Sequence, residues 1–244
     1  MKILKSIKNN IPNAITCLNL LCGALAVTVS QDPFSQTCVG MQGYQLAVLL
    51  IALAAVADFL DGMVARLIGA VSSIGKELDS LSDLVSFGLA PAMLLFNLLK
   101  ASAPESILPY WALLIPIFGA LRLARFNVDT NQATTFTGLP IPANAMFWVG
   151  YTWFLASLGT QPEAHFLSQS TAVIILILLL CYLMVSPLRM FSLKLHGFSL
   201  SEAWRQYVII VAAILLVIFL GIPGLSVLIA LYVLMSLADK FIKP

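Results

Sequence analysis

The stretch ADFLDGMVARLIGAVSSIGKELDSLSD, residues 57–83, concentrates acidic side chains in a chain that is otherwise strongly apolar. Four aspartates fall within it: Asp58, Asp61, Asp79 and Asp83. The whole chain has 244 residues, of which 60% are hydrophobic and 10% are charged. Soluble domains carry about a quarter charged residues, so this composition is typical of a membrane protein. The four carboxylates therefore need a compensation that apolar surroundings do not supply.

The spacing within residues 57–83 predicts two helices whose acidic faces meet. At 100° per residue, one face of the first helix has Arg66 at its edge and collects Asp58, Asp61, Gly62 and Ala65. On the second helix, Gly75, Asp79 and Asp83 repeat every four residues and form one stripe. The short connection near residues 68–75 makes the two helices antiparallel neighbours, so the sequence predicts one polar cavity between two membrane helices.

Apolar runs long enough to cross a bilayer occur along the whole chain. A membrane helix needs roughly 20 residues, and continuous runs without period-two alternation favour helices over a barrel. We predict an all-α, polytopic transmembrane helical bundle with about eight spans, near residues 12–30, 44–67, 79–99, 107–126, 140–158, 170–190, 204–220 and 223–241. The last two runs flank GIPG (221–224), where a re-entrant hairpin is the alternative.

Basic residues sort to one side of the predicted membrane. With an inner amino terminus, twelve of the thirteen Lys and Arg residues fall in inner segments, and Lys100 is the exception. The positive-inside rule predicts this asymmetry for an even number of spans with both termini cytoplasmic. Residues 1–11, with three lysines against an apolar face, predict a short interfacial amphipathic helix. The net charge of +2 is spread along one membrane face, and we expect no nucleic acid as a partner.

Four carboxylates near the cytoplasmic rim need countercharge. An ionised Asp at the bilayer centre costs about 2.5–3.5 kcal/mol on insertion scales, and Arg66 and Lys76 are the cations nearby in sequence. A purely carboxylate ligand set favours hard divalent cations, Mg²⁺ or Mn²⁺ first and Ca²⁺ after them. Two such ions are the usual device for phosphoryl transfer. Gly62 would let a bulky ligand approach the helix, and Arg66 would hold a phosphate through paired donors.

The same residues have other interpretations when they are taken singly. An intramembrane Asp also serves as a proton relay, so an ion-coupled transporter is an alternative function. A face of small residues often packs against another helix. Arg66 alone would be a rim residue whose charged head reaches the interface. The four aspartates together with Gly62 and Arg66 favour a metal-dependent phosphate site.

These residues resemble the signature of the CDP-alcohol phosphatidyltransferase family, D-x2-D-G-x2-A-R-x7–8-G-x3-D-x3-D. Every fixed position is matched, by Asp58, Asp61, Gly62, Ala65, Arg66, Gly75, Asp79 and Asp83. IPNAITCLNLLCG (11–23) is similar to the family's Pro-Asn-x-x-Thr entry to the first span. Three further segments are similar to the family's integral-membrane phosphatidylserine synthases of bacteria and archaea: GKELDSLSDLVSFGLAPA (75–92), ALRLARFNV (120–128) and FTGLPIPANA (136–145).

The resemblance implies a domain organisation and a reaction. It implies a six-span core at residues 12–190 and two additional C-terminal transmembrane helices at 191–244. The implied reaction moves the phosphatidyl group of CDP-diacylglycerol to the hydroxyl of L-serine and releases CMP. The implied setting is a homodimer among the lipids of the cytoplasmic (inner) membrane, with its active site facing the cytoplasm.

The resemblance also implies roles for single residues. Two divalent cations would be held by Asp58, Asp61, Asp79 and Asp83, and Asp83 would also be the catalytic general base. CDP-diacylglycerol would contact Asp61, Gly62, Ala65, Arg66 and Gly75.

The acceptor site is the least defined part of the prediction. Serine carries a carboxylate, and Arg122 and Arg125, at the inner end of a span, are the candidates to bind it. Both would equally serve as positive-inside anchors. Sibling enzymes that use glycerol 3-phosphate or inositol phosphate are the near alternative, although their acceptor phosphate calls for more converging basic residues than these segments contain.

Overall fold

The structure is a computed structural model that describes residues 2–70, 72–128, 136–159, 170–190 and 200–242. The chain divides into two compact units, Met1–Ala120 and Leu121–Pro244. Within the described residues it is helical apart from one short strand pair and the connecting turns. This confirms the all-α, membrane-type helical class.

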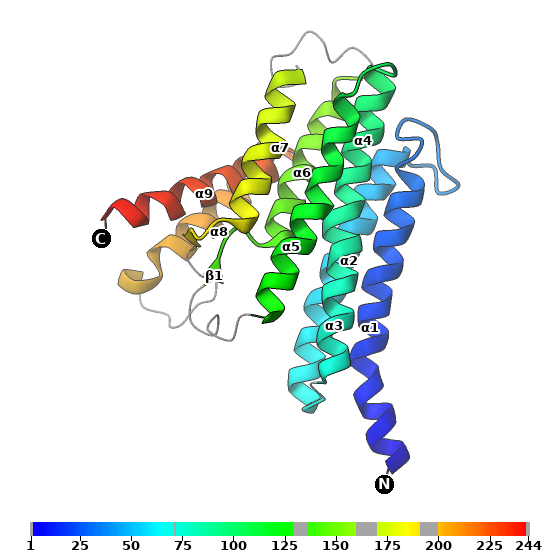
Figure 1. Cartoon of the computed structure of the whole chain (residues 1–244), viewed down its shortest axis with the longest axis vertical. Helices are drawn as coiled ribbons and strands as arrows, with labels where there is room; N and C mark the ends of the chain where they lie inside the picture. The colour runs from blue at the N-terminus through cyan, green and yellow to red at the C-terminus, as the bar shows by residue number, and fades with distance from the viewer. Residues whose placement is uncertain (1, 71, 129–135, 160–169, 191–199, 243–244) are drawn as a thin grey trace. The chain divides into compact units, whose positions relative to one another are not determined.

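The first unit is built from three helical rods that lie side by side (Figure 1). They are α1 (Lys2–Val29), α2 (Gly43–Ile68) and a composite rod of α3 (Ser73–Asp83), the π-helix η1 (Leu84–Leu89) and α4 (Ala90–Ser102). The 3₁₀ helix η2 (Leu108–Leu113) packs against α4 and leads into α5 (Leu114–Val128). The α1 rod contacts α2, α3, η1 and α4, so it is the common wall of this unit.

A tight connection turns α2 back into α3. Gly69 adopts φ 62°, a left-handed conformation that suits glycine, and its N–H bonds the carbonyls of Ala65 and Arg66 to close the helix. Ser72 then caps α3, because its hydroxyl accepts the N–H of Gly75 at 3.0 Å. The predicted short connection is confirmed, and it makes the two acidic helices neighbours.

Close contacts fix α1 against the composite rod. The hydroxyl of Ser82 donates to the Thr16 carbonyl at 3.2 Å, and that of Ser86 donates to the Asn19 carbonyl at 3.0 Å. One turn further along α1, a Cβ on Gly23 would lie under 3.0 Å from the Ser86 backbone. The missing side chain at position 23 therefore permits the close approach of η1 to α1.

After the last residues of α5, the described part of the second unit contains four helices and a small β-pair. The helices are α6 (Ile141–Ser157), α7 (Ser170–Val185), α8 (Leu200–Leu220) and α9 (Gly224–Ile242). The strands β1 (Phe136–Thr137) and β2 (Arg189–Met190) pair antiparallel, with Phe136 opposite Met190. Ser226 of α9 donates to the Phe147 carbonyl of α6 at 2.7 Å, and a Cβ on Gly150 would collide with Ser226. The α8–α9 hairpin is thus joined to this unit through α9.

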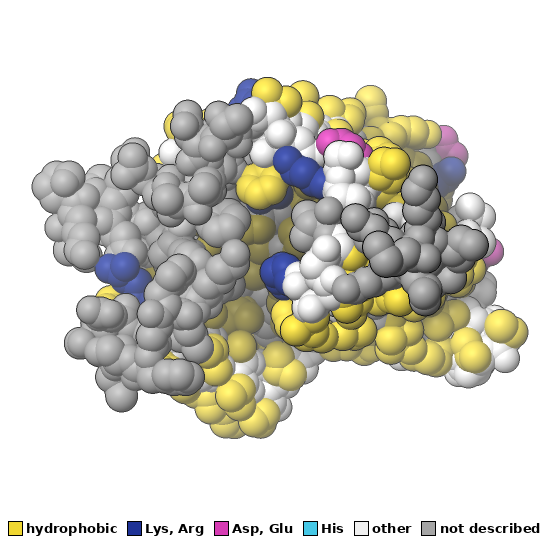
Figure 2. Space-filling view, turned by 90° about the horizontal axis from the view of Figure 1, so that it is seen from below, with side chains coloured by type: hydrophobic (Ala, Val, Ile, Leu, Met, Phe, Trp, Pro, Cys, Tyr) yellow, Lys and Arg dark blue, Asp and Glu magenta, His cyan; other side chains and the backbone are white. Residues whose placement is uncertain are grey.

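Large apolar side chains face outward on both units, as in a membrane protein. Phe59 of α2 is 65% exposed and Phe219 of α8 is 79% exposed. In the view of Figure 2, hydrophobic side chains cover much of the described surface, with scattered Lys and Arg side chains between them. Among the described residues, four helical stretches are long and apolar enough to cross a membrane: Asn10–Val29, Gly43–Ile68, Ser73–Ser102 and Leu108–Val128.

Several predicted boundaries differ from the structure. Residues 2–11, expected as a separate interfacial helix, run into α1 without a break, and Pro12 lies inside that helix. The span predicted at 170–190 ends at Val185, because Pro187 cannot continue a helix, and Arg189 and Met190 are in a strand. Apolar helices at Thr171–Val185, Trp204–Leu220 and Gly224–Ala238 are shorter than the four long stretches, so the count of eight spans stays a prediction. Lys194 and Lys243, two of the predicted inner-side cations, lie outside the described residues.

Gly23→Val tests the close approach of α1 and η1. The added side chain would overlap the Ser86 backbone, and we expect a loss of about 1–3 kcal/mol in the free energy of unfolding, as for other overpacked sites. Thermal unfolding in detergent measures it. Ala24→Val, at an exposed neighbouring position of the same helix, is the control. Equal unfolding temperatures for the two variants would show that Gly23 is not needed for this packing.

Candidate functional site

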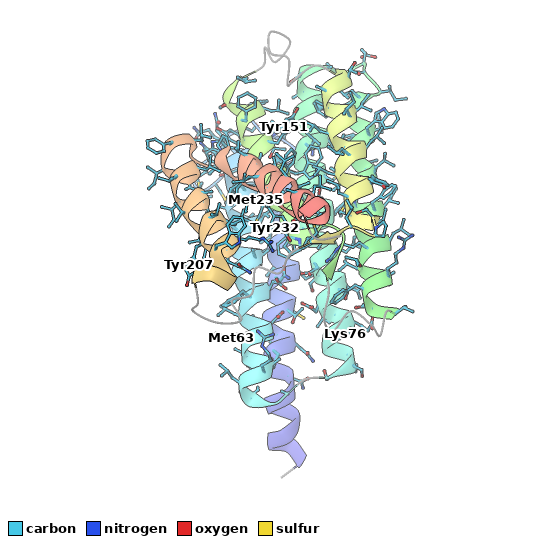
Figure 3. The ribbon with its side chains drawn as sticks, turned by 90° about the vertical axis from the view of Figure 1, so that its left-hand side faces the viewer. Met63, Lys76, Tyr151, Tyr207, Tyr232 and Met235 are labelled. Carbon is cyan, nitrogen blue, oxygen red and sulfur yellow. The ribbon has the colours of Figure 1, made fainter. Side chains whose placement is uncertain are left out.

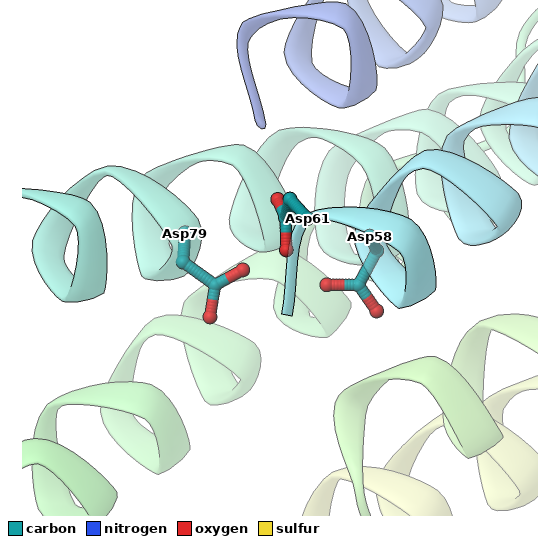
Figure 4. A group of neighbouring side chains, drawn as sticks. All are labelled: Asp58, Asp61 and Asp79. Atoms are coloured by element: carbon teal, nitrogen blue, oxygen red, sulfur yellow. The ribbon is translucent and has the colours of Figure 1, made fainter. Parts of the chain in front are cut away.

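Three of the four predicted aspartates converge in the first unit. Asp58 and Asp61 come from α2 and Asp79 comes from α3, and one carboxylate oxygen of each lies within 4.8 Å of those of the other two. Figure 4 shows the three carboxylates directed toward a common space between the two helices. Asp61 is buried, while Asp58 and Asp79 are half-buried. The predicted meeting of the acidic faces is confirmed for these three residues.

The fourth aspartate, Asp83, lies beside this group and is not part of the trio within 4.8 Å. It interacts electrostatically with Asp58 and Asp79, and it is within hydrogen-bonding reach of Asp58. On its other side, the side-chain amide of Asn19 donates to Asp83 Oδ1 at 3.4 Å. Asp83 is the last residue of α3, immediately before the π-helix η1. π-Helical turns are frequent at functional sites.

A cavity of about 210 Å³ adjoins the trio. Its lining includes every residue that the family signature assigns to the nucleotide-lipid donor, namely Asp61, Gly62, Ala65, Arg66 and Gly75, together with Asp79 and Lys76. Lys76 of α3 lies level with Met63 of α2 near the same end of the two helices (Figure 3). A Cβ on Gly62 would meet only the Arg66 guanidinium, at 3.5–4.0 Å, so the glycine leaves this wall open toward the cavity.

The first helix supplies a wall of this cavity that the sequence analysis did not assign to the site. Pro12, Asn13 and Thr16 of α1 line it opposite the acidic helices. The signal was present, since Asn13, Thr16 and Asn19 recur every three residues and interrupt an apolar span. Their common face is the one that α1 turns toward α3.

The donor set fits a divalent cation. The trio offers carboxylate oxygens alone, which are ligands that Mg²⁺, Mn²⁺ and Ca²⁺ accept. Asp61 Oδ2 is buried and has no hydrogen-bond partner among the described residues, so one ligand atom is left unsatisfied within the cluster. A bound cation would satisfy that oxygen and offset the mutual repulsion of the carboxylates. The coarse prediction of a metal-binding aspartate cluster is therefore supported by the arrangement of these side chains.

The two predicted acceptor residues, Arg122 and Arg125, share a separate cavity in the second unit. This cavity, of about 730 Å³, is also lined by Phe126, Thr137, Ser186 and Pro187 among others. Arg125 donates to the Val185 carbonyl at 3.0 Å, so one of its donors closes the end of α7. Arg122 is half-buried, with its guanidinium 5.8 Å from the Phe126 ring. The two arginines therefore line one cavity, and their role in binding the acceptor carboxylate stays a prediction.

Comparison with known proteins identifies the same segment. The sequence profile of the CDP-alcohol phosphatidyltransferase family matches residues 9–186, which is more than half of the chain. A CDP-diacylglycerol–serine O-phosphatidyltransferase of Bacillus subtilis is 36% identical over 201 residues, covering 81% of this chain and 98% of the relative. A protein of the same name from Methanocaldococcus jannaschii is 40% identical over 147 residues, covering 60% of this chain and 62% of the relative.

A third relative extends the similarity toward the C-terminus. The Helicobacter pylori protein with the same name is 31% identical over 227 residues, covering 91% of this chain and 87% of the relative. A match of that length must include part of residues 191–244, for which the sequence analysis had only hydropathy. At least part of the α8–α9 region therefore has a counterpart in this relative.

Asp58→Asn and Asp79→Asn test the metal cluster without any assay of activity. Each removes one negative ligand from the trio, and we expect Mn²⁺ affinity to fall by at least about tenfold. Electron paramagnetic resonance of Mn²⁺ added to the purified protein measures the bound fraction. Glu77→Gln removes an exposed carboxylate of α3 outside the cavity and is the matched control. Unchanged affinity in both Asp variants would exclude a metal at this cluster.

Proposed function

The chain belongs to the CDP-alcohol phosphatidyltransferase family, and we propose that it transfers the phosphatidyl group of CDP-diacylglycerol to L-serine. The observation that carries the proposal is the cavity whose walls are the signature residues and beside which three carboxylates converge. The names of the relatives supply the acceptor, because each of the three is a CDP-diacylglycerol–serine O-phosphatidyltransferase. The enzyme is thus a transferase of phospholipid synthesis.

The donor binds in the cavity of the first unit. Its diphosphate lies against the Arg66 guanidinium, whose paired N–H groups match phosphate oxygens. Gly62 and Ala65 have little or no side chain, so they leave room for the donor on the α2 side of the cavity. Gly75 leaves room on the α3 side. A Cβ on Gly75 would come within 3.1 Å of both Ser72 Oγ and Asn13 Oδ1, so a larger residue there would displace the polar walls. The cytidine half contacts the Asp61–Ala65 face, and the acyl chains extend toward lipid.

The aspartates hold two divalent cations, Mg²⁺ or Mn²⁺ in the first place and Ca²⁺ as the third choice. The ligands would be Asp58, Asp61, Asp79 and Asp83, of which the first three converge and Asp83 lies beside them. When bound, the cations neutralise charge on the diphosphate oxygens and favour displacement at phosphorus. Lys76 and Arg66 in the same cavity add positive charge near the leaving group.

The reaction exchanges one phosphorus–oxygen bond for another. The serine hydroxyl oxygen forms a bond to the phosphorus that bears the diacylglycerol, and the bond from that phosphorus to the bridging oxygen of CMP breaks. Asp83 accepts the hydroxyl proton, and CMP leaves with the bonding electron pair. A carboxylate is a weak base toward an alcohol, so its position relative to the hydroxyl has to supply much of the effect. The products are phosphatidylserine and CMP.

Arg122 and Arg125 bind the carboxylate of serine. Their cavity also contains the hydroxyl-bearing residues Thr137 and Ser186, which suits a small zwitterion. One Arg125 donor bonds the Val185 carbonyl at 3.0 Å, so a substitution of Arg125 would also remove a contact at the end of α7.

We also propose the setting of the enzyme. It is a homodimer in the cytoplasmic (inner) membrane of the cell, with about eight spans, both termini in the cytoplasm and the active site on the cytoplasmic side. The distribution of Lys and Arg supports this orientation. The division into a core at 12–190 and two further spans at 191–244 belongs to the same proposal.

A panel of acceptor alcohols tests the function. Purified protein in detergent, supplied with CDP-diacylglycerol and Mg²⁺ or Mn²⁺, should release CMP with L-serine and form labelled phosphatidylserine. Glycerol 3-phosphate and inositol phosphate should give little product, because the described lining of the acceptor cavity offers two arginines and no further cation. Labelled lipid from glycerol 3-phosphate but not from serine would assign a sibling reaction. Ion flux in liposomes without CMP release would favour a transporter.

Arg122→Gln tests the acceptor site. The loss of a charge-assisted hydrogen bond should raise KM for serine about tenfold and leave KM for CDP-diacylglycerol near its wild-type value. Lys100→Gln removes one positive charge from the predicted outer side and is the control. If KM for serine is equal in the two variants, Arg122 does not bind the acceptor, and its role is that of a positive-inside membrane anchor.

A further inference from the structure

A buried amide on the first helix contacts the proposed general base. Asn19 of α1 is 0% exposed, and its Nδ2 donates to Asp83 Oδ1 at 3.4 Å. Its Oδ1 is buried and has no hydrogen-bond partner among the described residues. Neither the composition of this span nor the family signature at 58–83 assigns a role to Asn19.

Stability does not account for this amide. Asn19 Oδ1 loses its hydrogen bonds to water on burial and gains no partner, which destabilises the fold. A leucine of similar shape at this position would avoid that cost. The single contact to Asp83 is long for a hydrogen bond, so it offsets the loss only in part. Polar groups that cost stability without a structural return are characteristic of functional sites.

The backbone around Asn19 is held in place from both sides. Its own carbonyl accepts from Ser86 in η1, and the Thr16 carbonyl, one turn earlier, accepts from Ser82. Ser82 and Ser86 flank Asp83 in the sequence, and Gly23 lets the Ser86 backbone approach α1. The amide and the carboxylate are therefore brought together by two rods fixed to each other on either side of the contact.

Asp83 has other side chains near it besides Asn19. Asp83 interacts with Asp58 and Asp79 and is within hydrogen-bonding reach of Asp58, so the orientation of its carboxyl group is not fixed by one partner alone. Among the described residues, Asn19 is the side-chain N–H donor that the structure gives to Asp83. An amide that binds Oδ1 restricts rotation of the carboxyl group and leaves Oδ2 for another partner.

We propose that Asn19 is a positioning residue for Asp83, whose Oδ1 it holds so that Oδ2 can accept the proton of the acceptor hydroxyl. This inference rests on the proposed function. The proton passes from the serine hydroxyl to Asp83 Oδ2 as the new phosphorus–oxygen bond forms, and Asn19 exchanges no proton and touches no substrate.

Asn19→Leu tests the proposal against a matched variant. The substitution keeps the size of the side chain and removes the donor, and we expect kcat to fall about tenfold to 100-fold, as for other small misplacements of a reacting group. KM for CDP-diacylglycerol and Mn²⁺ affinity should stay near wild type. Asn97→Leu removes an amide of α4 that donates to Ser30 Oγ at 3.5 Å, just beyond the end of α1, and should leave kcat near wild type. A purely structural role would instead change kcat, KM and unfolding temperature in parallel.

A double-mutant cycle tests the contact both by thermal unfolding, which needs no activity, and by turnover. Asn19→Leu, Asp83→Ala and the double variant are compared by thermal unfolding, and the two shifts in unfolding temperature should not add. In turnover, Asn19→Leu should cost little in a chain that already carries Asp83→Ala. Additive shifts in unfolding temperature, or a wild-type kcat in Asn19→Leu, would overturn the inference.

Failure of the inference is distinguishable from failure of the proposed function. A wild-type protein that forms phosphatidylserine while Asn19→Leu turns over at the same rate removes the role of Asn19 alone. A wild-type protein that forms no phosphatidylserine from serine removes the proposed function and the role of Asn19 with it, whatever the unfolding cycle gives.

Discussion

The repulsion among carboxylates gathered inside an apolar helical unit is the constraint on which the rest of the first unit depends. Three of them have oxygens within 4.8 Å of one another, and two like charges at that separation repel by on the order of 3 kcal/mol at an effective dielectric constant of about 20. The chain has to hold them together by other means. The end of α2 at Gly69 and the Ser72 cap of α3 contribute to this, because they keep the connection between the two helices short.

The first helix completes the site from the opposite side. It meets the composite rod through hydroxyl-to-carbonyl hydrogen bonds and through the glycine at position 23, which are short-range contacts suited to an interior without water. The same helix contributes Pro12, Asn13 and Thr16 to the cavity, and its Asn19 contacts Asp83. In the proposed function, a span with the composition of a hydrophobic anchor therefore also takes part in binding the donor and in positioning Asp83.

In the proposed function, the donor binds in the first unit and the acceptor binds in the second unit. Its larger cavity contains both arginines and two hydroxyl-bearing residues but none of the signature aspartates. This division suits a family in which one donor serves reactions with different alcohols. The relatives' similarity over most of the chain indicates that both units have been inherited together.

The sequence by itself determined the helical class, through its long apolar runs, and the meeting of Asp58, Asp61 and Asp79. That meeting follows because residues three or four apart share a helix face and the connection between α2 and α3 is short. Tertiary structure decided the rest. The π-helix after Asp83, the place of Asp83 beside rather than within the trio, and the contact from Asn19 depend on how α1 packs against the composite rod. The pairing of Phe136 with Met190 likewise joins segments far apart in sequence. Such contacts have no period along the chain, since they arise only when distant helices meet.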